Sequence, residues 1–185
     1  MRCMSSQSST IKSDQAAVDQ SRCAVIALGS NLAFQGSSSS ELVTAAAKRL
    51  EELSESPVRL SSLYRTAAQG LGPGANEFCN AVAVIVPSVD LSASDLLSKL
   101  LAIEALLGRE RRQPEAGATY ASRTLDLDLI FCRNEQIDTE FLQLPHPRAA
   151  QRRFVLAPLA ELWPDLRLSA ESMPVSDLLE LLPLE

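Results

Sequence analysis

Long apolar runs are missing from this chain. No segment of about 18 consecutive apolar residues occurs, and no apolar stretch follows the early charges at the N-terminus. These absences exclude an obvious membrane span or secretory signal, so we expect a cytoplasmic protein without a membrane partner. With 185 residues and 46% hydrophobic composition, the chain has enough apolar material for one core.

Cysteine is sparse and its spacing is irregular. Cys3, Cys23, Cys79 and Cys132 lie far apart, which argues against a zinc site. In a reducing compartment the same spacing argues against disulfides. We therefore expect free thiols, two or three of them buried in strands.

Lysine is absent beyond Lys99, and the net charge is −6. The acidic balance disfavours a nucleic-acid partner. Arginine supplies the positive charge in the later part of the chain, and seven arginines fall around the Asp-Leu-Asp segment, namely Arg109, Arg111, Arg112, Arg123, Arg148, Arg152 and Arg153. Because guanidinium groups bind phosphate oxygens in pairs, this set suits a polyphosphate ligand. Ordinary solvated surface charge is the alternative for each of them.

Hydrophobic periodicity and turn residues predict the order of the elements. We expect a strand at 24–28, a helix capped by Ser40 and ending before Pro57, strands at 58–65 and 78–86, and a helix from a Ser92–Asp95 cap to Gly108. Long loops at 66–77 and 109–122 separate these elements. Residues 1–22, rich in serine and glutamine, are predicted to be a disordered extension of a single domain at 23–185.

With a strand at the Asp-Leu-Asp segment, the order is βαββαβ. It predicts an α+β fold, a ferredoxin-like antiparallel sheet with two helices on one face. An additional C-terminal portion follows, with a turn at 133–136, an extended piece at 137–144 and apolar helices near 154–162 and 175–182. This fold hosts enzymes, ligand sensors and RNA-binding modules, so the function depends on the site residues.

Asp126 and Asp128 interrupt an apolar run in the last predicted strand. Strand side chains alternate, so Leu125, Leu127 and Leu129 would enter a core while both carboxylates share the other face. Paired hard oxygen ligands suit Mg²⁺ that carries nucleotide phosphates. The alternative is an amphipathic strand with a solvated acidic face.

Several short segments follow one another at specific spacing. They are Ala27-Leu28-Gly29-Ser30-Asn31-Leu32, Tyr64-Arg65-Thr66, Phe78-Cys79-Asn80-Ala81, Ile103-Glu104 with Gly108-Arg109, Arg123-Thr124-Leu125-Asp126-Leu127-Asp128, Pro145-His146-Pro147-Arg148 and Phe154-Val155-Leu156-Ala157-Pro158-Leu159. Over about residues 23–168 this set resembles the 6-hydroxymethyl-7,8-dihydropterin pyrophosphokinases of folate biosynthesis.

The resemblance implies a reaction and its site residues. The terminal pyrophosphoryl group of ATP would pass to the hydroxymethyl group of the dihydropterin, releasing AMP, with two Mg²⁺ ions on Asp126 and Asp128. The implied catalytic residues are Arg109, Arg123, Asp126 and Asp128. The implied ATP contacts are Glu104, Arg109, Arg111, Tyr120, Arg123, Leu129, His146 and Arg152, of which Arg109 and Arg111 would close as a lid. The implied pterin contacts are Thr66, Ala67, Phe78, Asn80, Asp126 and Phe154. Transient contact with the next folate enzyme is also implied.

Each residue type also has a plainer interpretation. His146, the only histidine, is on its own as consistent with a structural role, and Phe78 and Phe154 with core packing. Gly29 and Asn31 are expected to form the turn after the first strand rather than to touch phosphate, because no P-loop lysine follows.

The chain departs from the family pattern in its two long loops. The segment between Arg109 and Arg123 is longer than usual, and residues 119–122 stand where a basic residue, Trp, Gly and Pro commonly occur. We expect Tyr120 to take the place of the tryptophan and Arg112 that of the basic residue. Residues 67–68 replace a proline-containing stretch.

Two other classes of function fit parts of the same pattern. A non-catalytic nucleotide-binding domain on the same sheet would bind ATP without forming AMP. An unrelated Mg²⁺-dependent nucleotidyl or glycosyl transferase would also use an Asp-Leu-Asp motif, but with another acceptor.

Overall fold

The computed structural model describes residues 19–68, 74–110 and 122–183. In chain order the elements are η1 (Gln20–Arg22), β1 (Ala24–Ser30), α1 (Ser39–Leu50), η2 (Glu51–Leu53), β2 (Arg59–Leu60), β3 (Tyr64–Thr66), β4 (Phe78–Ile85), α2 (Ala93–Leu106), β5 (Asp126–Cys132), β6 (Ile137–Asp138), β7 (Gln143–Leu144), η3 (Ala149–Gln151), α3 (Arg153–Leu162) and α4 (Val175–Glu180). Within the described part, no helix is long and apolar enough to cross a membrane.

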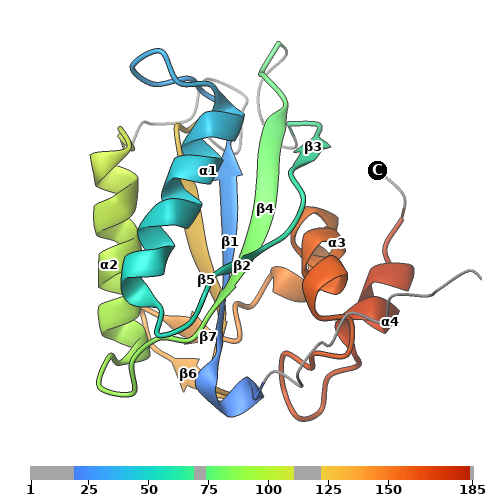
Figure 1. Cartoon of the computed structure of the whole chain (residues 1–185). Helices are drawn as coiled ribbons and strands as arrows, with labels where there is room; N and C mark the ends of the chain where they lie inside the picture. Colours follow the sequence, from blue (N-terminus) through green and yellow to red (C-terminus); the bar gives the residue numbers. More distant parts are fainter. Residues whose placement is uncertain (1–18, 69–73, 111–121, 184–185) are drawn as a thin grey trace, which may run out of the picture.

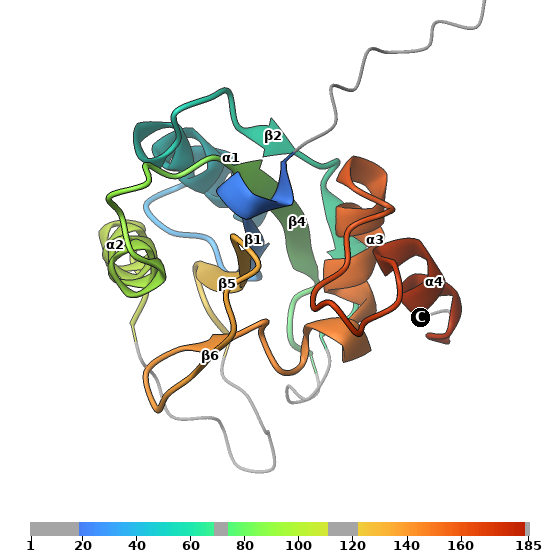
Figure 2. The same cartoon turned by 90° about the horizontal axis from the view of Figure 1, so that it is seen from below.

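The main sheet is antiparallel, with the order β2-β4-β1-β5 and β3 paired to β4. This is the strand order that the βαββαβ prediction requires, with its second strand divided between β2 and β3. Helices α1 and α2 cover one face of the sheet, and α3 and α4 lie on the other (Figures 1 and 2). The α+β fold class is confirmed, and the predicted C-terminal portion supplies the second helical layer.

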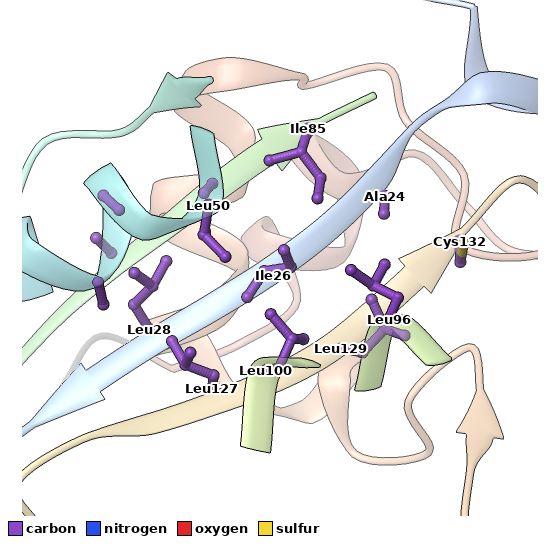
Figure 3. Close-up of a cluster of buried hydrophobic side chains, with 14 of the residues drawn as sticks. Ala24, Ile26, Leu28, Leu50, Ile85, Leu96, Leu100, Leu127, Leu129 and Cys132 are labelled. Carbon is purple, nitrogen blue, oxygen red and sulfur yellow. The ribbon is translucent and has the colours of Figure 1, made fainter. Parts of the chain in front are cut away.

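The core under α1 and α2 contains the leucines of the Asp-Leu-Asp segment. Leu127 and Leu129 of β5 lie beside Leu96 and Leu100 of α2 (Figure 3). Each such burial stabilises the fold by about 1.5–3 kcal/mol. The predicted alternation therefore holds from Leu125 to Leu129, and the two aspartates face the α3 side.

Alternation fails immediately after Leu129. The pairing of β5 with β1 shifts between Val25 and Ile26, so that Ile26 pairs with Leu129 and Val25 with Phe131. The extra residue, Ile130, is a β-bulge, and both Ile130 and Phe131 join the core under α3.

Two predictions about the elements were wrong. Ser38, not Ser40, caps α1, because Glu41 reciprocates its hydrogen bonds in a capping box. The predicted strand at 58–65 is interrupted, because Ser61 Oγ accepts the Val82 amide at 3.0 Å and takes the place of a carbonyl in the ladder. Gln20–Arg22 of the predicted N-terminal extension form a 3-10 turn, and residues 1–18 lie outside the described part.

The cysteine prediction holds where it can be checked. Cys23, Cys79 and Cys132 are buried free thiols, the last two in strands. Burial raises the pKa of the Cys132 thiol to about 11, so it stays protonated at neutral pH. Cys3 lies outside the described residues.

Candidate active site

A cavity of about 300 Å³ opens between the β1–β5 side of the sheet and the start of α3. Its lining comes from β1, β3, β4, β5 and the segment before α3. The lining residues are Ala27, Leu28, Gly29, Thr66, Ala67, Phe78, Asn80, Arg123, Asp126, Asp128, Arg148, Gln151, Arg152 and Phe154. The cavity therefore joins all of the predicted pterin contacts with Asp128, Arg123 and Arg152. Arg109 and His146 are not part of this lining, but they lie beside the aspartates.

Asp126 is held between two arginines. Arg109 Nη1 donates to its Oδ1 at 3.0 Å, and Arg123 Nη1 donates to its Oδ2 at 2.6 Å. The three side chains keep only 20–26% of their surface exposed. Charge interactions are stronger at such a shielded position than on an open surface. Both arginines are also close enough to the cavity to turn toward an anionic ligand.

Asp128 has a second set of basic neighbours. Arg152 Nη1 donates to Asp128 Oδ2 at 3.0 Å, and His146 Nε2 lies 4.0 Å from the same oxygen. The Arg148 amide donates to His146 Nδ1 at 3.1 Å, which leaves the proton of the neutral ring on the Asp128 side. Burial lowers the pKa of His146 and outweighs the opposing effect of Asp128, so the ring is neutral at physiological pH.

Aromatic and amide side chains also line the cavity. Phe78 and Phe154 line it from β4 and α3, and the Arg152 guanidinium carbon lies 5.5 Å from the centroid of the Phe154 ring. The buried Asn80 donates from Nδ2 to Thr66 Oγ1 at 2.8 Å. Ring faces beside a fixed amide are suited to a flat polar heterocycle.

Asn31 positions the segment that carries Arg123. The Arg123 amide donates to Asn31 Oδ1 at 2.8 Å, and the Asn31 amide donates to the Arg123 carbonyl at 3.1 Å. Asn31 Nδ2 also donates to Ser122 Oγ and to the Asn76 carbonyl. These contacts give Asn31 a structural role, as expected, because they hold neighbouring segments of main chain in place.

Two predicted ATP contacts point away from the cavity. The side chain of Leu129 is 3% exposed and lies in the core under α2, so only its main chain, on the outer edge of β5, could reach a ligand. Glu104 is 7% exposed on the same face, and its Oε1 accepts the Leu127 amide at 2.7 Å. Burial raises the pKa of Glu104 to about 7.

This pKa predicts a pH-dependent stability. Between the ordinary pKa of 4.5 and about 7, folded Glu104 holds a proton that the unfolded chain releases. The free energy of unfolding should therefore fall as pH rises through this window, by up to about 3 kcal/mol. Urea titrations at pH 5 and pH 8 would measure the fall in the wild type and its reduction in Glu104→Gln. The exposed Glu140→Gln variant is the control, and an equal fall in all three would contradict the assignment.

Some residues differ from the sequence-based set. Arg111 and Tyr120 lie outside the described residues. Arg148, which was predicted only as one of the arginines suited to a polyphosphate ligand, lines the cavity, and so do Gln151 and Gly29, for which no contact was predicted. The Pro-His-Pro-Arg segment signals Arg148, but nothing local to the sequence signals Gln151.

The donor set fits a magnesium ion bound together with phosphate. Asp126 and Asp128 offer two hard carboxylates to one cavity. Across the described ranges no group of three potential side-chain ligands occurs, so the other ligands of such an ion would be water and phosphate oxygens. Mg²⁺ takes this kind of coordination at nucleotide sites.

Paired carboxylates ringed by arginines beside an aromatic pocket are typical of enzymes that transfer phosphorus groups to a small acceptor. Residues 25–164 match the model of the 7,8-dihydro-6-hydroxymethylpterin-pyrophosphokinase (HPPK) family. The chain belongs to this family of folate-biosynthesis pyrophosphokinases, as its sequence motifs predicted.

Bacterial relatives named 2-amino-4-hydroxy-6-hydroxymethyldihydropteridine pyrophosphokinase support the assignment. The Pseudomonas aeruginosa protein is 40% identical over 145 residues, covering 77% of this chain and 82% of the relative. The Bacillus subtilis protein is 37% identical over 149 residues, covering 80% and 83%. The Synechocystis protein is 43% identical over 107 residues, and the match spans 58% of this chain but only 50% of that relative.

Solved structures share the fold at low sequence identity. A structure of HPPK-DHPS in complex with substrates aligns with a TM-score of 0.59 at 13% identity, covering 85% of this chain and 43% of that chain. Plasmodium falciparum HPPK-DHPS A437G with SDX-DHP aligns with a TM-score of 0.61 at 16% identity, covering 85% and 45%. This chain therefore spans less than half of those longer proteins.

Proposed function

We propose that this chain catalyses Mg²⁺-dependent transfer of pyrophosphate from ATP to 6-hydroxymethyl-7,8-dihydropterin, giving AMP and the pterin diphosphate. The observation that carries the proposal is one shared cavity, whose lining includes Asp126 and Asp128, their arginine neighbours Arg123 and Arg152, and two phenylalanines. Family membership supports the reaction class.

Most of the positive charge that the protein places around the triphosphate would come from arginine side chains. When bound, Mg²⁺ would neutralise phosphate charge alongside them. Arg109 and Arg123 would turn from Asp126 toward the β- and γ-phosphates, and Arg152 would do the same from Asp128. His146, Arg148 and the positive end of α3 would face the same phosphates. These groups would stabilise charge as the bond from the β-phosphorus to AMP breaks.

The pterin would occupy the aromatic end of the cavity. Phe78 and Phe154 would contact its faces, while Asn80 and the main chain at Thr66 and Ala67 would read its polar edge. In this arrangement the hydroxymethyl oxygen would point toward Asp126. The nucleotide and the acceptor then meet at the aspartate pair, which is the arrangement that a direct transfer requires.

The direct test is AMP formation by the purified chain, with ATP and 6-hydroxymethyl-7,8-dihydropterin, with and without Mg²⁺. Metal-dependent AMP and pterin diphosphate in equal amounts are expected. Binding of ATP without AMP formation would instead support the non-catalytic nucleotide-binding domain. Activity with a different acceptor only would refute the pterin assignment.

Gly29 provides a test of the pterin end alone. A Cβ at Gly29 would lie 3.0 Å from Asn80 Oδ1 and 3.8 Å from Phe78 Cδ1. Because Asn80 is also bonded to Thr66, its amide has little room to move. Gly29→Ala should raise the KM for the pterin about tenfold, the equivalent of about 1.4 kcal/mol, with little change for ATP.

Steady-state kinetics with each substrate varied in turn would measure the effect. Gly36→Ala is the matched control, because a Cβ at Gly36 meets nothing within 4 Å. An unchanged KM for the pterin, or equal losses for both substrates, would remove Gly29 from the proposed pterin subsite.

We also propose transient contact with the next folate enzyme. The proposal is supported by the solved relatives named HPPK-DHPS, in which the HPPK-like part belongs to a longer chain. Copurification of the two purified enzymes at low salt would test it.

A further inference from the structure

Glu104 is a buried acidic residue outside the cavity. It lies near the end of α2, on the face of the sheet opposite the cavity, and is 7% exposed. Its Oε1 accepts the amide of Leu127 at 2.7 Å. The Leu127 amide belongs to the Asp126–Leu127 peptide, so the contact reaches the main chain between the two carboxylates.

The Leu127 amide needs this partner because of where β5 lies. β5 is an edge strand of the described sheet, and the Leu127 amide points away from β1 toward α2. Leu127 is 2% exposed, so water is not available to the amide. A buried amide without a partner is strongly disfavoured, and the Glu104 carboxyl oxygen supplies the acceptor that the Leu127 amide needs.

A second contact from the same end of α2 is made to Leu125, two residues before Leu127 in the chain. Arg109 Nη1 donates to the Leu125 carbonyl at 2.6 Å, and the Arg109 amide donates to the Glu104 carbonyl at 2.9 Å. Leu125 and Leu127 present these groups on the same outer edge, because strand peptides alternate in direction. We call the two contacts, Glu104 to Leu127 and Arg109 to Leu125, the edge bracket.

We propose that Glu104 is a positioning residue, which orients both aspartates by holding the Asp126–Leu127 peptide in the strand segment that carries them. Rotation of that peptide would move the Asp126 Cα directly and would shift Asp128 through the Leu127 Cα, so both carboxylates would be displaced. Displacement of catalytic groups by about 1 Å commonly lowers rates about a hundredfold. This role replaces direct ATP contact for the Glu104 side chain. The catalytic part of the inference rests on the proposed function.

Two substitutions separate the hydrogen bond from the charge. Glu104→Gln keeps an oxygen that can accept the Leu127 amide, while Glu104→Leu removes it at similar volume. The exposed Glu140→Gln variant controls for loss of one carboxylate. Thermal unfolding of each variant shows whether it folds. If Glu104→Leu does not fold, Glu104→Met is used in its place.

Three readouts are expected to change together. Glu104→Leu should speed hydrogen exchange at the Leu127 amide at least about tenfold. It should lower kcat about a hundredfold. It should also weaken Mn²⁺ binding, measured in the presence of ATP, about tenfold. The KM for ATP should change less than about threefold. Glu104→Gln should stay within about threefold of the wild type in all of them.

Several results would overturn the proposal. They are equal losses in Glu104→Gln and Glu104→Leu, an unchanged Leu127 exchange rate in Glu104→Leu, and a raised KM for ATP with unchanged kcat. If the wild-type chain forms no AMP, the proposed function fails, but amide exchange and Mn²⁺ affinity still decide whether Glu104 positions the pair.

Discussion

Asp126→Asn and Asp128→Asn are each expected to lower kcat roughly 10³-fold while the fold persists. The amide keeps the size of the side chain but removes the charge that would hold Mg²⁺ and balance Arg109 or Arg152. Both carboxylates keep a quarter to a third of their side-chain surface exposed, so loss of their ion pairs should destabilise the fold by only about 1 kcal/mol.

AMP release, metal binding and thermal unfolding would measure these effects on the same preparations. The exposed Asp90→Asn variant, whose residue lies in the turn before α2, is the control and should match the wild type. A double Asp126→Asn, Asp128→Asn variant with wild-type AMP production would refute the role of the pair.

The largest expected loss of stability comes from Gly108→Ala. Gly108 ends α2 with a φ of +83°, and a Cβ there would lie 2.4 Å from the ring of Phe34. Left-handed backbone at a residue with a side chain costs about 1–2 kcal/mol, and overpacking adds about 1–3 kcal/mol. We expect a total of about 2–4 kcal/mol, with loss of activity because Arg109 follows directly.

Gly36→Ala separates the two contributions. Gly36 has almost the same φ, +84°, but open space around the Cβ position, so only the backbone effect of about 1–2 kcal/mol is expected. Urea unfolding would compare the two variants. Equal destabilisation by both would show that the Phe34 contact is unimportant, and unchanged activity in Gly108→Ala would show that α2 does not place Arg109.

Part of the site was predictable because strand alternation is local. The positions of Asp126 and Asp128 on one face, and of Leu125, Leu127 and Leu129 on the other, follow from the spacing alone. The bulge at Ile130 was not predictable, because Ile130 and Phe131 are both apolar and either face could have buried them. The interruption at Ser61 depends on a hydroxyl that pairs across the sheet.

The role of Glu104 could not be read from the sequence for a different reason. Helical spacing places it near the end of α2, but its partner is a main-chain amide, and main-chain amides look alike in every sequence. Its contact with Leu127 depends on β5 being at the edge of the sheet, which is a tertiary property. The prediction that Glu104 contacts ATP came from family resemblance, which identifies a residue more readily than its partner.

The contacts on β5 also bear on the behaviour of the protein at high concentration. Exposed strand edges can add a strand from another molecule and so begin aggregation. Here α2 covers the Leu125 and Leu127 positions of that edge through the edge bracket, and the His146 amide donates to the Ile130 carbonyl further along. The groups that orient the aspartates are thus also groups that block strand addition. Variants that release β5 should therefore lose solubility together with activity.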